Sequence, residues 1–249
     1  MNIKFLKRKA FNLRQKTFNQ FILKKEAHLG GSFSMIEILI TMYDLILKKK
    51  DKFILSKAHA SFPLCILLRE KGYNPKIRTH LEIDPKNGIH CTTGSLGHGL
   101  PIATGMAFAR KKNNKEGNIF VMISDGECQE GTTWESLLIA SKHKLSNLII
   151  LIDYNKLQAL SKLEDALPLE SLKKKFQAFN FNTIEVKDGH SFSSIIKSFK
   201  KLSKKLPNAI IFNTIKGKGI KEFENNTIWH ARQLEGDEIL IGKKRLGIK

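Results

Sequence analysis

Short apolar runs alternate along the chain with stretches in which apolar residues recur every three or four positions. The apolar runs suit strands buried on both faces of a sheet; they cover residues 53–55, 119–123, 148–152, 181–186 and 209–215. The periodic stretches predict helices at residues 64–68, 100–110, 132–144, 169–179 and from 192 onward. Repeated strand and helix alternation predicts an α/β fold with a doubly wound, mainly parallel sheet and helices on both faces.

Both ends of the chain are predicted to be accessory segments of one domain. Residues 1–25 are predicted to form a surface helix that points four apolar side chains toward the fold: Phe11, Phe18, Phe21 and Ile22. Ser34 and Glu37 have the spacing of a capping box, which predicts a helix start there. Residues 235–249 are too few for another domain, and no low-complexity linker precedes them. We therefore expect residues 1–249 to form a single domain.

The charge of the chain introduces one alternative function. The 249 residues carry a formal net charge of +20, and the pI is near 9.9. Such a balance is typical of proteins that bind nucleic acid. However, lysine supplies most of the charge, and no aromatic-rich binding motif accompanies it. We therefore do not expect a nucleic-acid partner.

Cysteine content and hydropathy bear on the compartment. Cys65, Cys91 and Cys128 are odd in number, widely spaced and without a paired metal motif. This pattern predicts a reducing compartment, by default the cytoplasm. We expect neither a secretory signal at the N-terminus nor an apolar run long enough to span a membrane.

Candidate metal ligands follow two of the predicted strands. The run at residues 119–123 stops at Ser124-Asp125-Gly126, and Asn155 follows the next strand. Ligands of open parallel sheets bind at the carboxyl ends of strands, so Asp125 and Asn155 converge if these strands are adjacent. Carboxylate, amide and main-chain oxygens suit Mg²⁺, with Ca²⁺ or Mn²⁺ as alternatives, and leave coordination positions for a diphosphate. The structural alternative is an ordinary turn at a strand end.

Histidines and glycines gather in three further turns. His28 precedes a pair of glycines, His59 follows the strand at residues 53–55, and three glycines fall within residues 94–99. Closely spaced glycines let main-chain amides approach an anion or a ring. Each feature also has a structural interpretation. His28 suits a helix entry, the glycine loop suits a flexible connection, and His230 follows lysines at residues 216–218 that are typical of a solvated loop.

Taken together, these motifs resemble the transketolase family. Asp125-Gly126 followed by Asn155 resembles the thiamine-diphosphate signature, and residues 127–158 are similar to transketolase in particular. Ser124 stands where the usual signature has glycine. In the segment around His59, Ala58 likewise stands where the family has glycine.

The resemblance implies a fold, a reaction and a partner. It spans roughly residues 15–240, which correspond only to the N-terminal, diphosphate-binding portion of a full-length transketolase. It implies the thiamine-diphosphate-binding fold and the N-terminal subunit of a split transketolase that uses thiamine diphosphate and Mg²⁺. With a separate C-terminal, pyrimidine-binding subunit, expected as an α2β2 hetero-tetramer, it would transfer a two-carbon ketol unit from a ketose to an aldose. The substrates would be sugars or sugar phosphates.

The resemblance also assigns roles to individual residues. Catalytic roles fall to His28, His80, His230 and Glu130, the last near an activating glutamate of the partner. Cofactor binding falls to His59, Gly94, Leu96, Asp125, Gly126, Glu127 and Asn155. The metal ligands would be Asp125, Asn155 and the main-chain carbonyl of Leu157.

Two other functions stay open from the sequence. One is a diphosphate-binding subunit of another thiamine-diphosphate enzyme, of the 2-oxoacid dehydrogenase or 1-deoxyxylulose-5-phosphate synthase type, although the set of histidines argues against both. The other, more distant, is the basic nucleic-acid-binding protein raised by the net charge.

Overall fold

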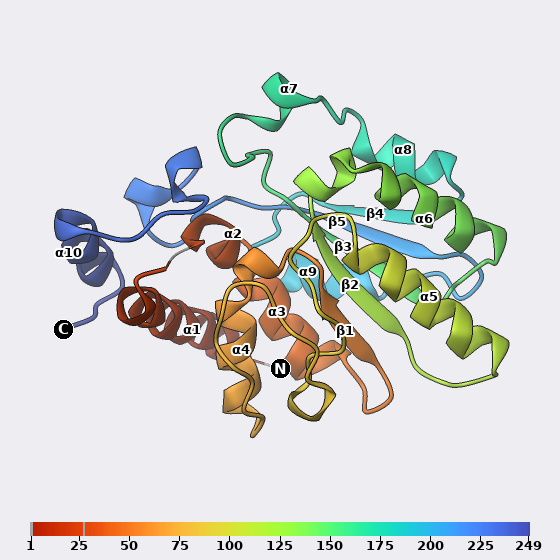
Figure 1. Cartoon of the computed structure of the whole chain (residues 1–249), viewed down its shortest axis with the longest axis horizontal. Helices are drawn as coiled ribbons and strands as arrows, with labels where there is room; N and C mark the ends of the chain where they lie inside the picture. Colours follow the sequence, from red (N-terminus) through yellow and green to blue (C-terminus); the bar gives the residue numbers. More distant parts are fainter. Residues whose placement is uncertain (1, 27) are drawn as a thin grey trace.

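The computed structural model describes residues 2–26 and 28–249, and its centre is a sheet of five parallel strands (Figure 1). The strand order is β1-β2-β3-β5-β4. The strands are β1 (Lys52–Leu55), β2 (Ile119–Ser124), β3 (Leu148–Tyr154), β4 (Asn182–Val186) and β5 (Asn208–Asn213). Every strand predicted from the apolar runs is present, and every pair of neighbours in the sheet is parallel.

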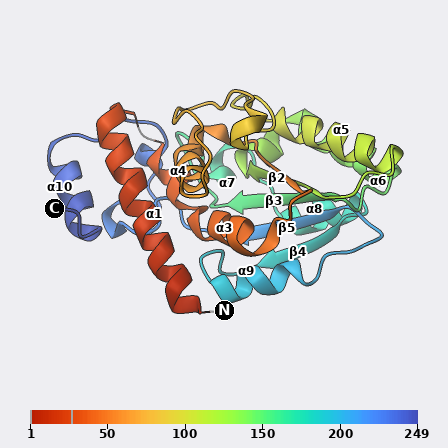
Figure 2. The ribbon, with the colours of Figure 1, turned by 90° about the horizontal axis from the view of Figure 1, so that it is seen from below.

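Helices cover both faces of the sheet, with α9 on one side and α5 and α6 on the other (Figure 2). The α-helices are α1 (Ile3–Lys24), α2 (Leu29–Phe33), α3 (Ile36–Thr41), α4 (Phe62–Glu70), α5 (Gly99–Lys112), α6 (Gly131–Lys142), α7 (Leu163–Ala166), α8 (Leu172–Ala178), α9 (Phe192–Phe199) and α10 (Gly236–Arg245). A π-helical turn, η1 (Met42–Ile46), continues α3, and short 3₁₀ turns lie at Ala58–Ala60, Pro85–Asn87, Gly126–Gln129, Lys221–Phe223 and Thr227–Trp229.

Side chains of the central strands alternate between two apolar layers, as the period of a strand requires. In β2, Phe120 and Met122 belong to a core shared with α1, α3, α4 and α9. Val121 and Ile123 point to the other face, toward a core shared with α5, α6 and α8. This three-layer arrangement confirms the predicted doubly wound α/β fold.

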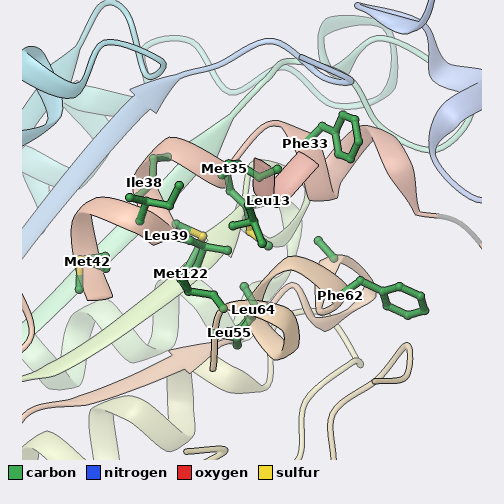
Figure 3. Packing of buried hydrophobic residues seen from close by; sticks show 14 of the residues in the cluster. Leu13, Phe33, Met35, Ile38, Leu39, Met42, Leu55, Phe62, Leu64 and Met122 are labelled. Carbon is green, nitrogen blue, oxygen red and sulfur yellow. The ribbon is translucent and has the colours of Figure 1, made fainter. Parts of the chain in front are cut away.

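The first of these cores joins segments that are far apart in the sequence (Figure 3). Leu13 of α1, Ile38 of α3, Leu55 of β1 and Met122 of β2 are buried together there. The segment Leu29–Ile46 is apolar and long enough to cross a membrane, contrary to the expectation from the sequence, but 78% of it is buried inside the fold. Burial of this extent is what a core segment of a folded domain shows.

Two predictions near the N-terminus are wrong. Phe11 is 43% exposed, because the buried face of α1 is instead formed by Leu6, Leu13, Phe18 and Phe21. Ser34 is not the N-cap of α3, which is Met35; its hydroxyl instead lies within hydrogen-bond distance of the Gly31 carbonyl at 3.0 Å and of Asp153 Oδ2 at 2.5 Å. Glu37 pairs with Arg14 at 2.8 Å rather than with the main chain of a helix start.

Caps explain the boundaries of two later helices. Ser191 accepts a hydrogen bond from the main-chain N–H of Ser194, which confirms it as the predicted cap of α9. The Ser171 hydroxyl accepts a hydrogen bond from the main-chain N–H of Lys174 and caps α8. The helix therefore begins at Leu172, later than the predicted residue 169. The tail beyond residue 234 contains α10, whose Gly242 lies directly against the Phe18 ring of α1.

Candidate active site

The carboxyl ends of β2 and β3 lie side by side, as expected for a shared ligand site. Ser124 is paired in register with Asp153, and Asp125 follows immediately. Asp125 is only 2% exposed; its carboxylate accepts hydrogen bonds from the main-chain N–H groups of Gly126 at 2.9 Å and Lys156 at 2.6 Å. Burial, reinforced by the neighbouring charge of Asp153, raises the pKa of Asp125 to about 6. A cation bound here would favour the ionised carboxylate.

Asn155 and Leu157 lie on the turn after β3, next to Asp125. Asn155 is buried, and its Oδ1 accepts from the main-chain N–H of Leu157 at 3.1 Å. The carbonyl of Leu157 accepts from Lys216 Nζ at 3.3 Å. Two hollows, of about 550 and 310 Å³, are both lined by Asn155 and Lys156. The turn therefore presents buried oxygen atoms beside open space.

Glu127 is fully buried and connects three segments by hydrogen bonds: the end of β1, the glycine loop and the end of β2. Its carboxylate accepts hydrogen bonds from Ser56 Oγ at the end of β1, from Gly97 N at 3.0 Å and from Ser124 N at 3.1 Å. Ser124 in turn accepts from Glu127 N at 3.2 Å through its hydroxyl, a contact that a glycine here would lack. Both carboxylate oxygens of Glu127 are thus occupied by the protein itself, which makes this residue a support for the glycine loop.

A buried ion pair lies beneath the site. Lys57, at the end of β1, is 1% exposed and pairs with Asp153, which is fully buried. Lys57 Nζ also donates to the carbonyl of Gly31 at 2.9 Å, and Thr214 Oγ1 donates to Asp153. Burial alone would raise the pKa of Asp153, but the charge of Lys57 and the hydrogen bonds from Lys57, Ser34 and Thr214 hold it below its usual value.

Three imidazoles from distant parts of the chain form a cluster. Ring centroids lie 5.7 Å apart for His28 and His59, 5.9 Å for His28 and His230, and 5.4 Å for His59 and His230. His28 Nδ1 is buried and has no hydrogen-bond partner within residues 2–26 and 28–249. Lys216 Nζ lies 3.2 Å from His230 Nδ1. The cluster therefore offers a buried polar atom to a ligand.

Burial keeps these imidazoles neutral. It lowers the pKa of His28 to about 4, aided by the charges of His80 and Lys216, and lowers that of His230 to about 4, aided by Lys216 and His28. The pKa of His59 is also well below its usual value, because of burial and the charge of Lys57. Neutral rings can both donate and accept a hydrogen bond at pH 7.

The lowered pKa values predict a specific acid sensitivity. Between about pH 6.5 and 4 the unfolded chain binds protons at His28 and His230 that the folded chain does not, so their contribution to stability falls as the pH falls. Replacing both residues with glutamine removes that contribution. We expect urea unfolding to show a smaller stability loss between pH 7 and 5 in the double variant than in the unmodified chain. Carboxyl groups titrate in both proteins, so equal losses would contradict the assignment of buried neutral histidines.

The glycine loop lies against His80. His80 has a φ of +61° and is exposed, and a Cβ on Gly94 would fall 2.5 Å from its ring. Gly94 itself has a φ of +153°, a conformation that disfavours any side chain. Leu96 is partly buried on the same loop. Glu130 is exposed at the N-cap position of α6, and its side chain makes no capping hydrogen bond.

The sequence did not reveal three buried charged residues of the site: Lys57, Asp153 and Lys216. Lys57 and Lys216 are each 1% exposed, although the lysines after residue 215 were predicted to be solvated. Burial lowers the pKa of Lys216 to about 8, and its Nζ donates to the carbonyl of Gln158 at 2.6 Å. No local signal in the sequence indicated the burial of Lys216, because the glycine that it packs against is far away in the chain. A Cβ on Gly30 would lie 2.7 Å from Lys216 Cγ, so the side chain passes directly over that glycine.

The donor set suits a divalent ion that also takes oxygens from its ligand. In the part of the chain that the structure describes, no three His, Cys, Asp or Glu side chains gather in a metal-binding group. Asp125 and Asn155 together supply one carboxylate and one amide, too few to complete octahedral coordination. A diphosphate would provide the remaining oxygens, so these residues fit a metal-diphosphate complex.

Comparison with known proteins decides the family. The family described as "Transketolase, thiamine diphosphate binding domain" matches residues 10–249. The chain belongs to the transketolase family. This confirms the predicted family, cofactor class and type of enzyme, a transketolase-type transferase.

Individual relatives of the transketolase family agree with this assignment. One is a protein of Actinobacillus succinogenes named as one of the subunits of apulose-4-phosphate transketolase; it is 35% identical over 241 residues, which are 88% of this chain and 87% of that protein. The 6-deoxy-6-sulfo-D-fructose transketolase subunit SqwG of a Clostridium species is 32% identical, over 92% and 91% of the two chains. The transketolase of Leishmania mexicana shares the fold, with a TM-score of 0.88 and 23% identity over 98% of this chain. The present chain spans only 41% of that transketolase.

Proposed function

We propose that this chain is the N-terminal, thiamine-diphosphate-binding subunit of a split transketolase, working in the cytoplasm with a separate C-terminal subunit. The observation that carries the proposal is the match to relatives that are named as single subunits. The chain is 35% and 32% identical to two of them and covers 87% and 91% of their lengths. Three free, buried cysteines are consistent with a reducing compartment.

In the proposed site, Mg²⁺ is held by the Asp125 carboxylate, the Asn155 amide oxygen and the Leu157 carbonyl; Ca²⁺ or Mn²⁺ would suit the same oxygens. Gly126 leaves room for the diphosphate, and Gly94, Leu96 and His59 contact the cofactor. When bound, thiamine diphosphate supplies the carbanion stabilisation that ketol transfer needs.

The histidines supply proton transfer and orientation at the reacting end. Neutral His28 and His230 can each donate to or accept from a sugar hydroxyl, and His80 at the edge of the glycine loop completes the set. Lys216 beside His230 adds a positive charge that favours an anionic group. Of the two relatives that are named as subunits, one is named after a sugar phosphate and the other after a sulfo-sugar. Both sugars carry an anionic group, which supports a donor ketose that also carries one.

The supporting residues hold this arrangement in place. Glu127 ties the glycine loop to the ends of β1 and β2. The Lys57 and Asp153 pair connects β1 and β3 to α2 at Gly31, near His28. These residues act as positioning residues because their polar atoms bond to the protein.

The C-terminal subunit is proposed to dock on α5 and α6, which pack side by side (Figure 1). Residues 99–109 of α5 contain no charged residue, which is unusual in a chain with 27% charged residues. Exposed apolar side chains occur on both helices: Ile102, Phe108, Leu138 and Ile139. The surface continues to Glu130 and the glycine loop, so a partner bound here would reach the site. The proposed assembly contains two copies of each subunit.

A charge placed on this surface should disrupt the complex. Leu138→Glu puts a carboxylate at a side chain that is 61% exposed, so folding should be unaffected while the apolar contact is lost. We expect affinity for the C-terminal subunit, measured by calorimetry, to fall at least about 10-fold. Leu240→Glu on α10, where leucine is 64% exposed, is the matched control and should change affinity less than about 2-fold. Equal effects of the two changes would place the partner elsewhere.

The donor substrate distinguishes the proposed enzyme from other thiamine-diphosphate enzymes. The complex of both subunits is given phosphorylated ketoses, pyruvate and 2-oxoglutarate, each with an aldose acceptor. Transfer of a two-carbon unit from a ketose supports the proposal. Turnover of a 2-oxoacid without ketose turnover would replace it with a 2-oxoacid-decarboxylating function.

A further inference from the structure

A further hollow, with a basic lining, lies at the amino ends of β1 and β2. The candidate active site lies at the opposite, carboxyl ends of the strands. The volume of the basic hollow is about 900 Å³, within the range of small-molecule sites and larger than the hollows beside Asn155. Its walls come from the turn before β1, the end of α4, the loop around His90 and the turn before β2. β2 has six residues, so about 20 Å of strand separates its amino end from Asp125.

Positive charge dominates the lining of the hollow. Seven cationic side chains face two acidic ones, Asp51 and Glu116, which leaves an excess of five positive charges. The cationic residues are Lys48, Lys49, Lys50, Lys52, Lys71, Arg110 and Lys115. A concentration of one charge sign in a concave surface raises the local concentration of ligands of the opposite sign.

The acidic groups nearby do not neutralise this excess. The Asp51 carboxylate accepts from the main-chain N–H groups of Lys48 at 2.9 Å and Asn118 at 2.7 Å. Glu116 pairs with Lys50 at 2.6 Å, and Lys71 pairs with Asp44 at 2.8 Å. Four of the lining lysines make no ion pair with any carboxylate of residues 2–26 and 28–249: Lys48, Lys49, Lys52 and Lys115.

Hydrogen bonds to the protein hold the side chains of two of these cations, Arg110 and Lys52, in the lining of the hollow. Arg110 Nη1 is held by the carbonyls of Lys50 at 2.6 Å and Glu116 at 3.0 Å. Lys52 Nζ lies 3.4 Å from His90 Nδ1. Burial and the charges of Lys52 and Arg110 lower the pKa of His90 to about 4, so its imidazole is neutral at pH 7 and can accept a hydrogen bond from Lys52.

The remaining wall is apolar and aromatic. Tyr43 packs edge-on against Phe53 with ring centroids 5.6 Å apart, and Tyr73 is 44% exposed. Leu47 and Leu68 complete this side. A hollow that is lined by both cations and aromatic rings suits a ligand that carries both phosphates and a flat ring. The hollow's volume of about 900 Å³ favours a small molecule over a nucleic-acid strand.

We propose that this hollow binds a nucleoside polyphosphate, at a site separate from the candidate active site. Lys48, Lys49 and Lys52 contact the phosphates, and the tyrosines contact the base. The proposal does not depend on the transketolase function, because none of these residues belongs to the site at the carboxyl ends of β2 and β3.

The test is an ATP titration by calorimetry in the presence of saturating thiamine diphosphate and Mg²⁺. We expect saturable binding, weaker binding of adenosine and of inorganic tripolyphosphate than of ATP, and at least about a 10-fold loss of ATP affinity in the Lys48→Ala, Lys49→Ala, Lys52→Ala triple variant. The matched control removes three exposed lysines elsewhere, Lys174, Lys204 and Lys205, so both variants lose the same net charge. The control should bind ATP within about 2-fold of the unmodified chain.

Further measurements separate this site from the others. Asp125→Asn should leave ATP affinity unchanged, and excess thiamine diphosphate should not compete. Loss of ATP binding in either case would place ATP in the cofactor site and overturn the proposal. It is also overturned by absence of saturable binding, by equal losses in the two lysine variants, or by tighter binding of single-stranded RNA than of ATP through the same three lysines.

Discussion

Replacing Asp125 with asparagine should weaken Mg²⁺-dependent binding of thiamine diphosphate at least about 100-fold, since even partners of metal ligands cost 10- to 100-fold when removed. Asp125 is 2% exposed and is the carboxylate we assign to the metal. Asparagine keeps the shape and can still accept from the main-chain N–H of Lys156, so the turn should persist. Only the negative charge is lost. Calorimetric titration of the cofactor at fixed Mg²⁺ measures the effect.

The control for this prediction is an exposed aspartate at the start of α7. Asp165→Asn removes the same charge from the chain at a position outside the site, and it should leave cofactor affinity unchanged. Asp125→Asn should also unfold at a urea concentration close to that of the unmodified chain. Cofactor affinity within a few-fold of the unmodified chain in Asp125→Asn would remove this residue from the metal site.

The second large effect concerns the buried pair of Lys57 and Asp153. Lys57→Met should lower the free energy of unfolding by about 3–5 kcal/mol, because it leaves the Asp153 carboxylate charged and unpaired in the interior. Both side chains are almost completely buried, so water cannot compensate. Urea denaturation, with the m-value compared between variants, gives the change in stability.

A double variant tests the cause of that loss. In Lys57→Met, Asp153→Asn the buried charge is gone, while the amide oxygen can still accept from Thr214 Oγ1 and the amide NH2 can donate to Ser34 Oγ, whose own proton goes to the Gly31 carbonyl. The double variant should recover much of the stability that the single variant loses. Lys16→Met, which breaks an exposed pair with Glu70, should cost no more than about 1 kcal/mol. Additive losses in the double variant would show that the pair stabilises by packing alone.

Much of the fold was predictable because the strand signal is local. The run at residues 119–123 is apolar and ends at Ser124, and its length and β-branched content suit a strand that is buried on both faces, as β2 is. The tertiary partners were less accessible. The buried face of α1 includes Leu6 and Leu13 rather than Phe11, because the angle at which a helix docks is set by distant segments such as α3, α4 and α10. Ser34 and Glu37 matched a local motif but were engaged by Asp153 and Arg14 instead.

The part of the candidate site that lies directly after predicted strands could be predicted from the sequence. Asp125 and Asn155 follow adjacent strands, so their convergence needed only the sheet topology. Lys57, Asp153 and Lys216 were not predictable in this way, because the pairing of a buried charge depends on residues that the fold brings together across the sheet. The burial of Lys216 against Gly30 likewise depends on a tertiary contact. The lysines and glycines around residue 216 are by themselves typical of a solvated loop.

The proposed dependence on a second subunit is tested by the rate of ketol transfer from a phosphorylated ketose to an aldose, measured for the chain alone and during titration with the C-terminal subunit. Thiamine diphosphate and Mg²⁺ are present throughout. We expect no transfer by the chain alone and a rate that rises as the partner is added and saturates at one partner per chain. Full transfer activity from this chain without any partner would contradict the proposed dependence.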